Sequence, residues 1–158
     1  MPNELDSSRI LAIVEEKGKS KEHLLSILLA IQNASGKNYV QEEWAKIVAA
    51  ELNLSLSMVY DVLTFYSMFS TKPRGRHVIE ICKSTPCYIS KSDVIAKIFE
   101  KHLGIKVGET TQDQQFTLQY TACVGACDIG PVAKIGEEIY GNLTEDKINS
   151  IIIKYQGE

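Results

Sequence analysis

The first seventy residues repeat apolar side chains at the spacing of an amphipathic helix. Apolar positions three and four residues apart share one face of a helix, and four successive segments show this spacing. The segments are Ile10–Val14, Leu24–Ile31, Trp44–Leu52 and Val59–Met68. Gly18 and Gly36 follow the first two segments as stop signals, and Ser55 is a good N-cap for the fourth. We therefore predict a small helical bundle.

After residue 71 the apolar pattern changes from a helical period to a period of two. A polar stretch with Pro73 and Gly75 separates the two patterns. Strands are predicted at Val78–Ile81, Phe116–Tyr120, Val132–Ile135 and Glu138–Tyr140, and helices at Lys91–Leu103 and Asp146–Tyr155. This order is that of an α/β sandwich, thioredoxin-like in outline. We expect an α+β fold with two domains, a helical bundle over residues 1–71 and an α/β domain over residues 72–158.

Composition and charge exclude two classes of partner. The chain has 158 residues, of which 44% are hydrophobic, and its net charge is −3. No apolar stretch approaches the roughly 20 residues of a membrane span, so we expect no membrane insertion. No basic tail or stripe is present, which argues against a nucleic-acid partner. Residues 1–6 include Glu4 and Asp6 and lack the apolar core of a signal peptide, so we expect a soluble, cytoplasmic protein.

The four cysteines of the chain form two close pairs. Cys82 and Cys87 follow the first predicted strand, and Cys123 and Cys127 follow the second. Four such thiolates could bind structural zinc, bind an iron–sulfur cluster, or form disulfides. Because each pair follows a strand, we expect both loops at one end of the sheet.

The residues between the cysteines favour a [2Fe–2S] cluster, although the spacing alone is compatible with zinc. Ser84 and Thr85 offer hydroxyl groups to a sulfur atom, and Val124–Ala126 are small enough for backbone to approach a bulky cluster. Two pairs would supply one pair of ligands to each iron. Neither pair has the two-residue interval of a thioredoxin redox motif, and a reducing location disfavours structural disulfides. The ligand spacing of plant ferredoxins is also absent.

Three segments resemble a known family. They are Thr64–Phe69, Leu103–Thr111 and Cys123–Cys127. Together with both cysteine intervals, they resemble the thioredoxin-like [2Fe–2S] subunit of NADH:quinone oxidoreductase, a subunit type that also occurs in NAD(P)-linked hydrogenases and formate dehydrogenases. The resemblance extends from about Leu24 to Tyr155.

The resemblance implies a function in electron transfer. The family's four cluster ligands correspond to Cys82, Cys87, Cys123 and Cys127, and no residue of the chain is expected to be catalytic on its own. The implied partner is a flavin-bearing subunit that carries FMN and reacts with NAD(P)(H), alongside further iron–sulfur subunits. The helical bundle would offer a docking surface to the flavin-bearing subunit.

The chain departs from the family pattern at two places near the ligands. The family commonly has alanine before the proline that follows the last ligand, whereas here Gly130 precedes Pro131. The glycine that usually follows Asp113 is replaced by Gln114. In addition, the carboxylate of Asp128 follows the last ligand directly, and its negative charge is expected to lower the reduction potential of a cluster.

Two other functions fit parts of the sequence. The segment Glu42–Phe65 resembles a helix-turn-helix, as in an iron–sulfur transcription regulator, but Ser57–Ser67 contains Asp61 and no Lys or Arg with which to contact DNA. A free-standing ferredoxin or thiol oxidoreductase is the second alternative, although such a protein would not need the helical segment. Aromatic residues at helical spacing are expected in the bundle core: Trp44, Tyr60, Phe65, Tyr66 and Phe69.

Overall fold

The computed structural model describes residues 5–157, which divide into two compact units on either side of the Arg74–Gly75 bond. Each unit has a hydrophobic core of its own. The first four residues, on which the expectation about a signal peptide partly rests, lie outside the described residues. The domain ranges 1–71 and 72–158 stay a prediction.

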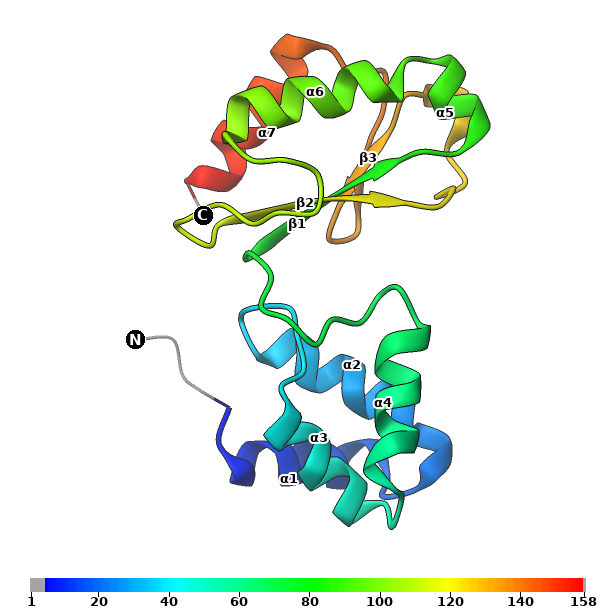
Figure 1. Ribbon diagram of the computed structural model, residues 1–158, viewed down its shortest axis with the longest axis vertical. Coiled ribbons are helices and arrows are strands. Elements are labelled where there is room, and N and C mark those ends of the chain that lie inside the picture. The colour runs from blue at the N-terminus through cyan, green and yellow to red at the C-terminus, as the bar shows by residue number, and fades with distance from the viewer. Residues whose placement is uncertain (1–4, 158) are drawn as a thin grey trace. The chain divides into compact units, whose positions relative to one another are not determined.

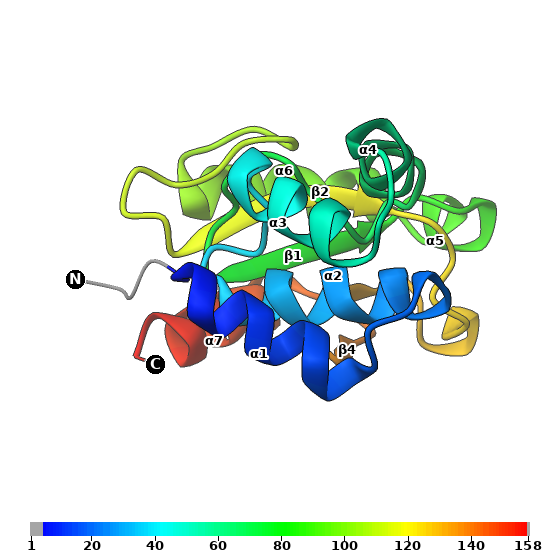
Figure 2. The ribbon, with the colours of Figure 1, turned by 90° about the horizontal axis from the view of Figure 1, so that it is seen from below.

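The N-terminal unit is helical, as the spacing of its apolar residues predicts. Its elements are α1 (Ser7–Lys17), the 3₁₀ turn η1 (Lys21–His23), α2 (Leu24–Ala34), α3 (Glu42–Glu51) and α4 (Leu56–Phe65). Helix α1 packs against α2 and α3, and α3 packs against α4 (Figures 1 and 2). Ser55 caps α4, because its hydroxyl accepts a hydrogen bond from the N–H of Met58 at 3.3 Å. Within residues 5–157, no helix has the length and apolar character to cross a membrane.

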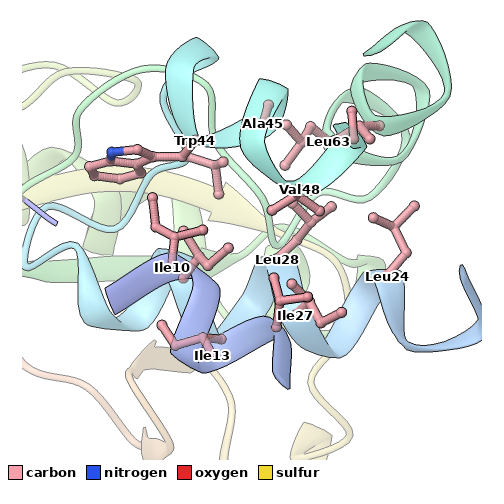
Figure 3. Close-up of a cluster of buried hydrophobic side chains, with 14 of the residues drawn as sticks. Ile10, Ile13, Leu24, Ile27, Leu28, Trp44, Ala45, Val48 and Leu63 are labelled. Carbon is pink, nitrogen blue, oxygen red and sulfur yellow. The ribbon is translucent and has the colours of Figure 1, made fainter. Parts of the chain in front are cut away.

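Aliphatic side chains from all four helices fill the core of this unit (Figure 3). Trp44 and Phe69 are buried in it, as expected, and Tyr60 and Tyr66 are partly buried. The expectation that Phe65 belongs to this core is wrong, because 80% of the residue is exposed. The fully buried members include Ile10, Val14, Ile27, Leu28, Ile31, Ala45, Val48 and Val59.

The C-terminal unit is a four-stranded sheet with two long helices on one face (Figure 1). Its elements are β1 (His77–Cys82), α5 (Thr85–Ile89), α6 (Ser92–Leu103), β2 (Phe116–Thr121), the 3₁₀ turn η2 (Cys127–Ile129), β3 (Ala133–Ile135), β4 (Glu138–Tyr140) and α7 (Glu145–Gln156). The strand order is β2-β1-β3-β4; β1 and β2 are parallel, and the other pairs are antiparallel. A helical unit followed by a mixed α/β unit confirms the predicted fold class.

Alternation along the strands separates a buried face of the sheet from a polar face. On the polar face Glu80 lies in register with Gln119 and Lys134, and the amide of Gln119 donates to the Glu80 carboxylate at 2.9 Å. The opposite face packs against α6 and α7. Its buried strand residues are Ile79, Ile81, Phe116, Leu118, Ala133 and Ile135.

Candidate metal centre

The parallel pairing of β1 and β2 brings the two cysteine pairs to the same end of the sheet. Cys82, the last residue of β1, lies opposite Thr121, the last residue of β2. Cys87 follows in the segment after β1, and Cys123 lies two residues beyond the end of β2. The N–H of Lys83 donates to the carbonyl of Thr121 at 3.2 Å, which joins the two loops at their base. The two loops therefore begin side by side, as predicted from their places after the strands.

The first pair is buried. Cys82 and Cys87 are each 1% exposed, and Cys87 lies within the short helix α5. The apolar spacing did not predict α5, because five residues are too few to show a helical period. The available signal was Ser84, a good N-cap residue, with Pro86 in the first turn after it. Thr85, a predicted donor to sulfur, is the first residue of this helix.

Hydrogen bonds to its sulfur favour the thiolate form of Cys82. Burial raises the pKa of this thiol, but donors from the Ser84 backbone, the Cys87 thiol, the Ser84 hydroxyl and the Val124 backbone together hold the pKa below its usual value. Cys87 behaves in the opposite way, since burial and the hydrogen bond with Cys82 raise its pKa. Of the predicted donors, Ser84 and Val124 thus lower the pKa of Cys82.

The second pair is exposed, and its sulfur atoms are close together. The Sγ atoms of Cys123 and Cys127 are 3.5 Å apart. Two thiolates bound to one tetrahedral metal ion at about 2.3 Å would be separated by about 3.8 Å, so the observed spacing suits a shared metal ion. The N–H of Gly125 donates to the Cys123 sulfur at 3.4 Å, and Gly125 has a φ of +86°, which favours glycine. The hydrogen bond with Cys123, together with burial, raises the pKa of Cys127.

Residues next to the second pair pack against the buried first pair and form one small apolar cluster with it. Cys82 and Cys87 form a buried group with Val132, and three partly buried side chains pack against it: Val124, Ala126 and Ile129. After the effects of Cys123 and of burial, the charge of Cys82 is a smaller contribution to the raised pKa of Cys127. Within residues 5–157, no three His, Cys, Asp or Glu side chains are grouped so as to hold a single metal ion. All four thiols are free. Metal ligands that are all sulfur atoms, with N–H and O–H groups as hydrogen-bond donors to them, fit a soft metal centre.

Four free thiols at one end of an α/β sheet, after a helical unit, are an arrangement in which an iron–sulfur protein can bind its cluster. The profile of the family described as thioredoxin-like [2Fe-2S] ferredoxin matches residues 10–156, and the chain belongs to this family. The family expected from the cysteine intervals and the flanking segments is thereby confirmed.

Relatives of the chain are components of larger oxidoreductases. The chain is 46% identical over 111 residues to an NADH-quinone oxidoreductase subunit of Rickettsia felis, a match that covers 70% of this chain and 66% of the relative. It is 30% identical to the NADP-reducing hydrogenase subunit HndA of Solidesulfovibrio fructosivorans, over 92% of this chain and 84% of the relative. Among solved structures, H2-reduced NAD+-reducing [NiFe]-hydrogenase shares the fold with a TM-score of 0.76 at 19% identity, over 89% of this chain and 23% of the hydrogenase chain.

Proposed function

We propose that this chain is an electron-transfer subunit of an NAD(P)-linked oxidoreductase complex and that its four cysteines bind a [2Fe–2S] cluster. The observation that carries the proposal is the register of β1 and β2, which places a pair of free thiols after each strand at one end of the sheet. Membership in a family named for this cluster supports the identity of the cofactor. The ligands are Cys82, Cys87, Cys123 and Cys127.

Each part of the site has a physical role in this function. A bound [2Fe–2S] cluster supplies one-electron redox chemistry. The burial of Cys82 and Cys87 excludes water from one side of the cofactor. The donors from Ser84, Val124 and Gly125 stabilise added negative charge on the sulfur atoms, which favours the reduced state. The end of β1 holds Cys82 and the short helix α5 holds Cys87, so that little reorganisation of this pair accompanies the change of charge.

The proposed partner is a flavin-bearing subunit that carries FMN and exchanges a hydride with NAD(P)(H), and further iron–sulfur subunits would continue the electron path. The names of two relatives support the proposal of this partner. The Rickettsia and Solidesulfovibrio proteins are both subunits of NAD(P)-linked enzymes. Four free thiols are in keeping with the reducing, cytoplasmic location proposed for the complex.

Helix α4 offers a docking surface for that subunit. Its inner face contributes Val59 and Leu63 to the core, yet Met58, Val62 and Phe65 form a second apolar stripe at i, i+4 and i+7, of which Val62 is partly buried against the core. Met58 is 50% exposed and Phe65 80%. A surface helix ordinarily carries one apolar stripe, so the second indicates an interface.

The charge on this face specifies the chemistry of the partner. Asp61 is the only charged residue between Asn53 and Thr71, and it lines the same groove as Met58 and Phe65. We therefore propose that the flavin-bearing subunit presents an apolar surface with a Lys or Arg side chain opposite Asp61. A second copy of this chain would carry a second Asp61 and is less complementary.

Anaerobic purification tests the cofactor directly. Iron and sulfide counts of two each per chain, and an electron paramagnetic resonance signal that appears on reduction, are the expected results. Replacing Cys123→Ala should abolish the visible absorption, whereas Thr121→Ala should retain it. Colourless protein that contains one zinc and no labile sulfide would refute the assignment.

Co-purification from the native host tests the partner. A tagged full-length chain should retain a subunit that contains FMN, and the complex should oxidise NADH or NADPH. A chain that carries the cluster and emerges alone would instead be a free-standing ferredoxin. The preferred nucleotide of the retained complex would distinguish an NAD-linked from an NADP-linked enzyme.

A further inference from the structure

The turn that carries Cys127 is held more by a neighbouring loop than by its own hydrogen bonds. In η2 the N–H of Ile129 donates to the carbonyl of Ala126 at 3.4 Å, and the N–H of Gly130 donates to the carbonyl of Cys127 at 3.3 Å. Both bonds are longer than the usual distance of about 2.9–3.0 Å. By contrast, the N–H of Asn142 donates to the carbonyl of Ile129 at 2.6 Å. The loop between β4 and α7 therefore anchors this turn.

Gly141, in the same loop, leaves no room for a side chain beside Ile129. A Cβ atom at position 141 would lie 2.5 Å from Cδ1 and Cγ1 of Ile129 and 2.6 Å from its Cβ. Ordinary carbon–carbon contacts are about 3.5–4.0 Å. A change of rotamer moves Cγ1 and Cδ1 but leaves Cβ in place, so only a backbone shift of one segment can relieve the collision. Glycine is thus required at position 141 for space.

A shift of Ile129 would reach both cysteine pairs. Ile129 lies two residues after Cys127, and it packs against the buried group that contains Cys82, Cys87 and Val132. The next residue, Gly130, abuts the first loop: a Cβ atom there would lie 3.5 Å from the hydroxyl of Ser90 and 3.7 Å from the sulfur of Cys87. The turn is therefore in contact with the β4–α7 loop through Gly141 and Asn142, and Gly130 has room for only a small side chain beside Cys87 and Ser90, the residue that follows α5.

We propose that Gly141 is a positioning residue for the [2Fe–2S] cluster. The missing side chain of Gly141 and the N–H of Asn142 fix Ile129, and Ile129 in turn fixes the sulfur of Cys127 relative to the first pair. This inference rests on the proposed function, in which the four cysteines bind the cluster. A larger residue at position 141 would move one ligand while the two hydrophobic cores stay intact.

A double-mutant cycle of Gly141→Ala and Ile129→Gly tests the proposal. The first substitution adds a Cβ atom at position 141, and the second removes the side chain with which that atom would collide. The readouts are the g values of the reduced cluster, its reduction potential, the rate of cluster loss to a chelator, and circular dichroism of the protein. Gly141→Ala should shift the g values and the potential and should release the cluster about tenfold faster, with the helical signal unchanged. In the Ile129→Gly background the same substitution should have no further effect.

Gly157→Ala is the matched control, since a Cβ atom at that position meets nothing closer than 3.7 Å. It should leave all four readouts unchanged. A merely structural role for Gly141 would lower the thermal midpoint of the protein without changing the g values or the potential, and that result would overturn the proposal.

The remaining outcomes also decide the question. Wild-type protein without a cluster would refute the proposed function, and this inference with it. A cluster in the wild type, with the same g values, potential and lifetime in Gly141→Ala, would overturn this inference alone. If Gly141→Ala does not fold, the double variant decides. A double variant that folds and binds the cluster as Ile129→Gly does supports the steric mechanism, and a double variant that does not fold contradicts it.

Discussion

The backbone N–H and the hydroxyl of Ser84 lower the pKa of the Cys82 thiol, in opposition to burial, which raises it. Replacing Ser84→Ala removes the hydroxyl donor and keeps the backbone donor. Because donors to sulfur stabilise the more negative reduced state, we expect the cluster to be retained and its reduction potential to fall by tens of millivolts. Redox titration followed by electron paramagnetic resonance measures the change. Thr85→Ala, one residue further along, is the control and should leave the potential unchanged; a rise in the Ser84→Ala variant would contradict the proposed role of this hydroxyl.

Asp128 places a negative charge beside the second pair, and this charge contributes to the raised pKa of Cys127. The same charge opposes the addition of an electron to a cluster bound there. Asp128→Asn should therefore raise the reduction potential, and the difference from wild type should shrink as salt is added. Asp146→Asn, in the first turn of α7, serves as the control. An unchanged potential in Asp128→Asn at low salt would show that solvent screens this carboxylate completely.

Gln114 occupies the left-handed backbone region, with a φ of +57°. This conformation costs a residue other than glycine about 1–2 kcal/mol, and substitution by glycine removes that cost. Glycine also has greater freedom in the unfolded chain, which offsets about 0.5–1 kcal/mol of the stability gained. Gln114→Gly should therefore stabilise the protein by roughly 0.5–1 kcal/mol in denaturant unfolding. Gln115→Gly, at a neighbour without a positive φ, should destabilise it. If both variants lose stability, side-chain contacts of Gln114 outweigh its backbone strain.

Phe65 is the most exposed member of the second apolar stripe on α4, so it should anchor the proposed flavin-bearing subunit. Phe65→Ser should weaken co-purification of that subunit at least about tenfold, as expected for an aromatic anchor, and should leave the cluster spectrum and the unfolding midpoint unchanged. Leu25→Ser, at a position on α2 that is 37% exposed, is the control. Analytical ultracentrifugation of the isolated chain would reveal a second copy as the occupant instead. Full retention of the subunit by Phe65→Ser would exclude α4 as its docking surface.

Much of the fold could be predicted because local chemistry determines where its elements begin and end. Gly104 takes the left-handed conformation that ends α6, and Thr144 caps α7 through the N–H of Lys147, at or next to the positions where the sequence placed the helix ends. The cysteine pairs were recognisable from their spacing, and the strands that deliver them from their alternation. The sequence also placed both loops at one end of the sheet, because each pair directly follows a strand.

The remaining features depend on contacts between distant residues or on elements too short to show a period. A helical period identifies apolar residues on α4 but does not say which of two stripes faces the core, so the exposure of Phe65 was missed. The left-handed conformation of Lys91, which displaces the predicted start of α6 to Ser92, has no sequence signal comparable to glycine. The contact between Gly141 and Ile129 joins two loops, and no local pattern predicts it.

The register of β1 and β2 also links cofactor loss to unfolding. The chain between Cys87 and Cys123 contains the whole crossover through α6, and a cofactor held by both pairs ties the two ends of that crossover together. Such a tether restricts the unfolded chain much as a disulfide does, and the binding energy of the metal becomes part of the folding energy. With such a cofactor bound, separation of the two strands would require its release. Bleaching of the visible colour during heating should accordingly trace the melting of this half of the protein, without any added dye.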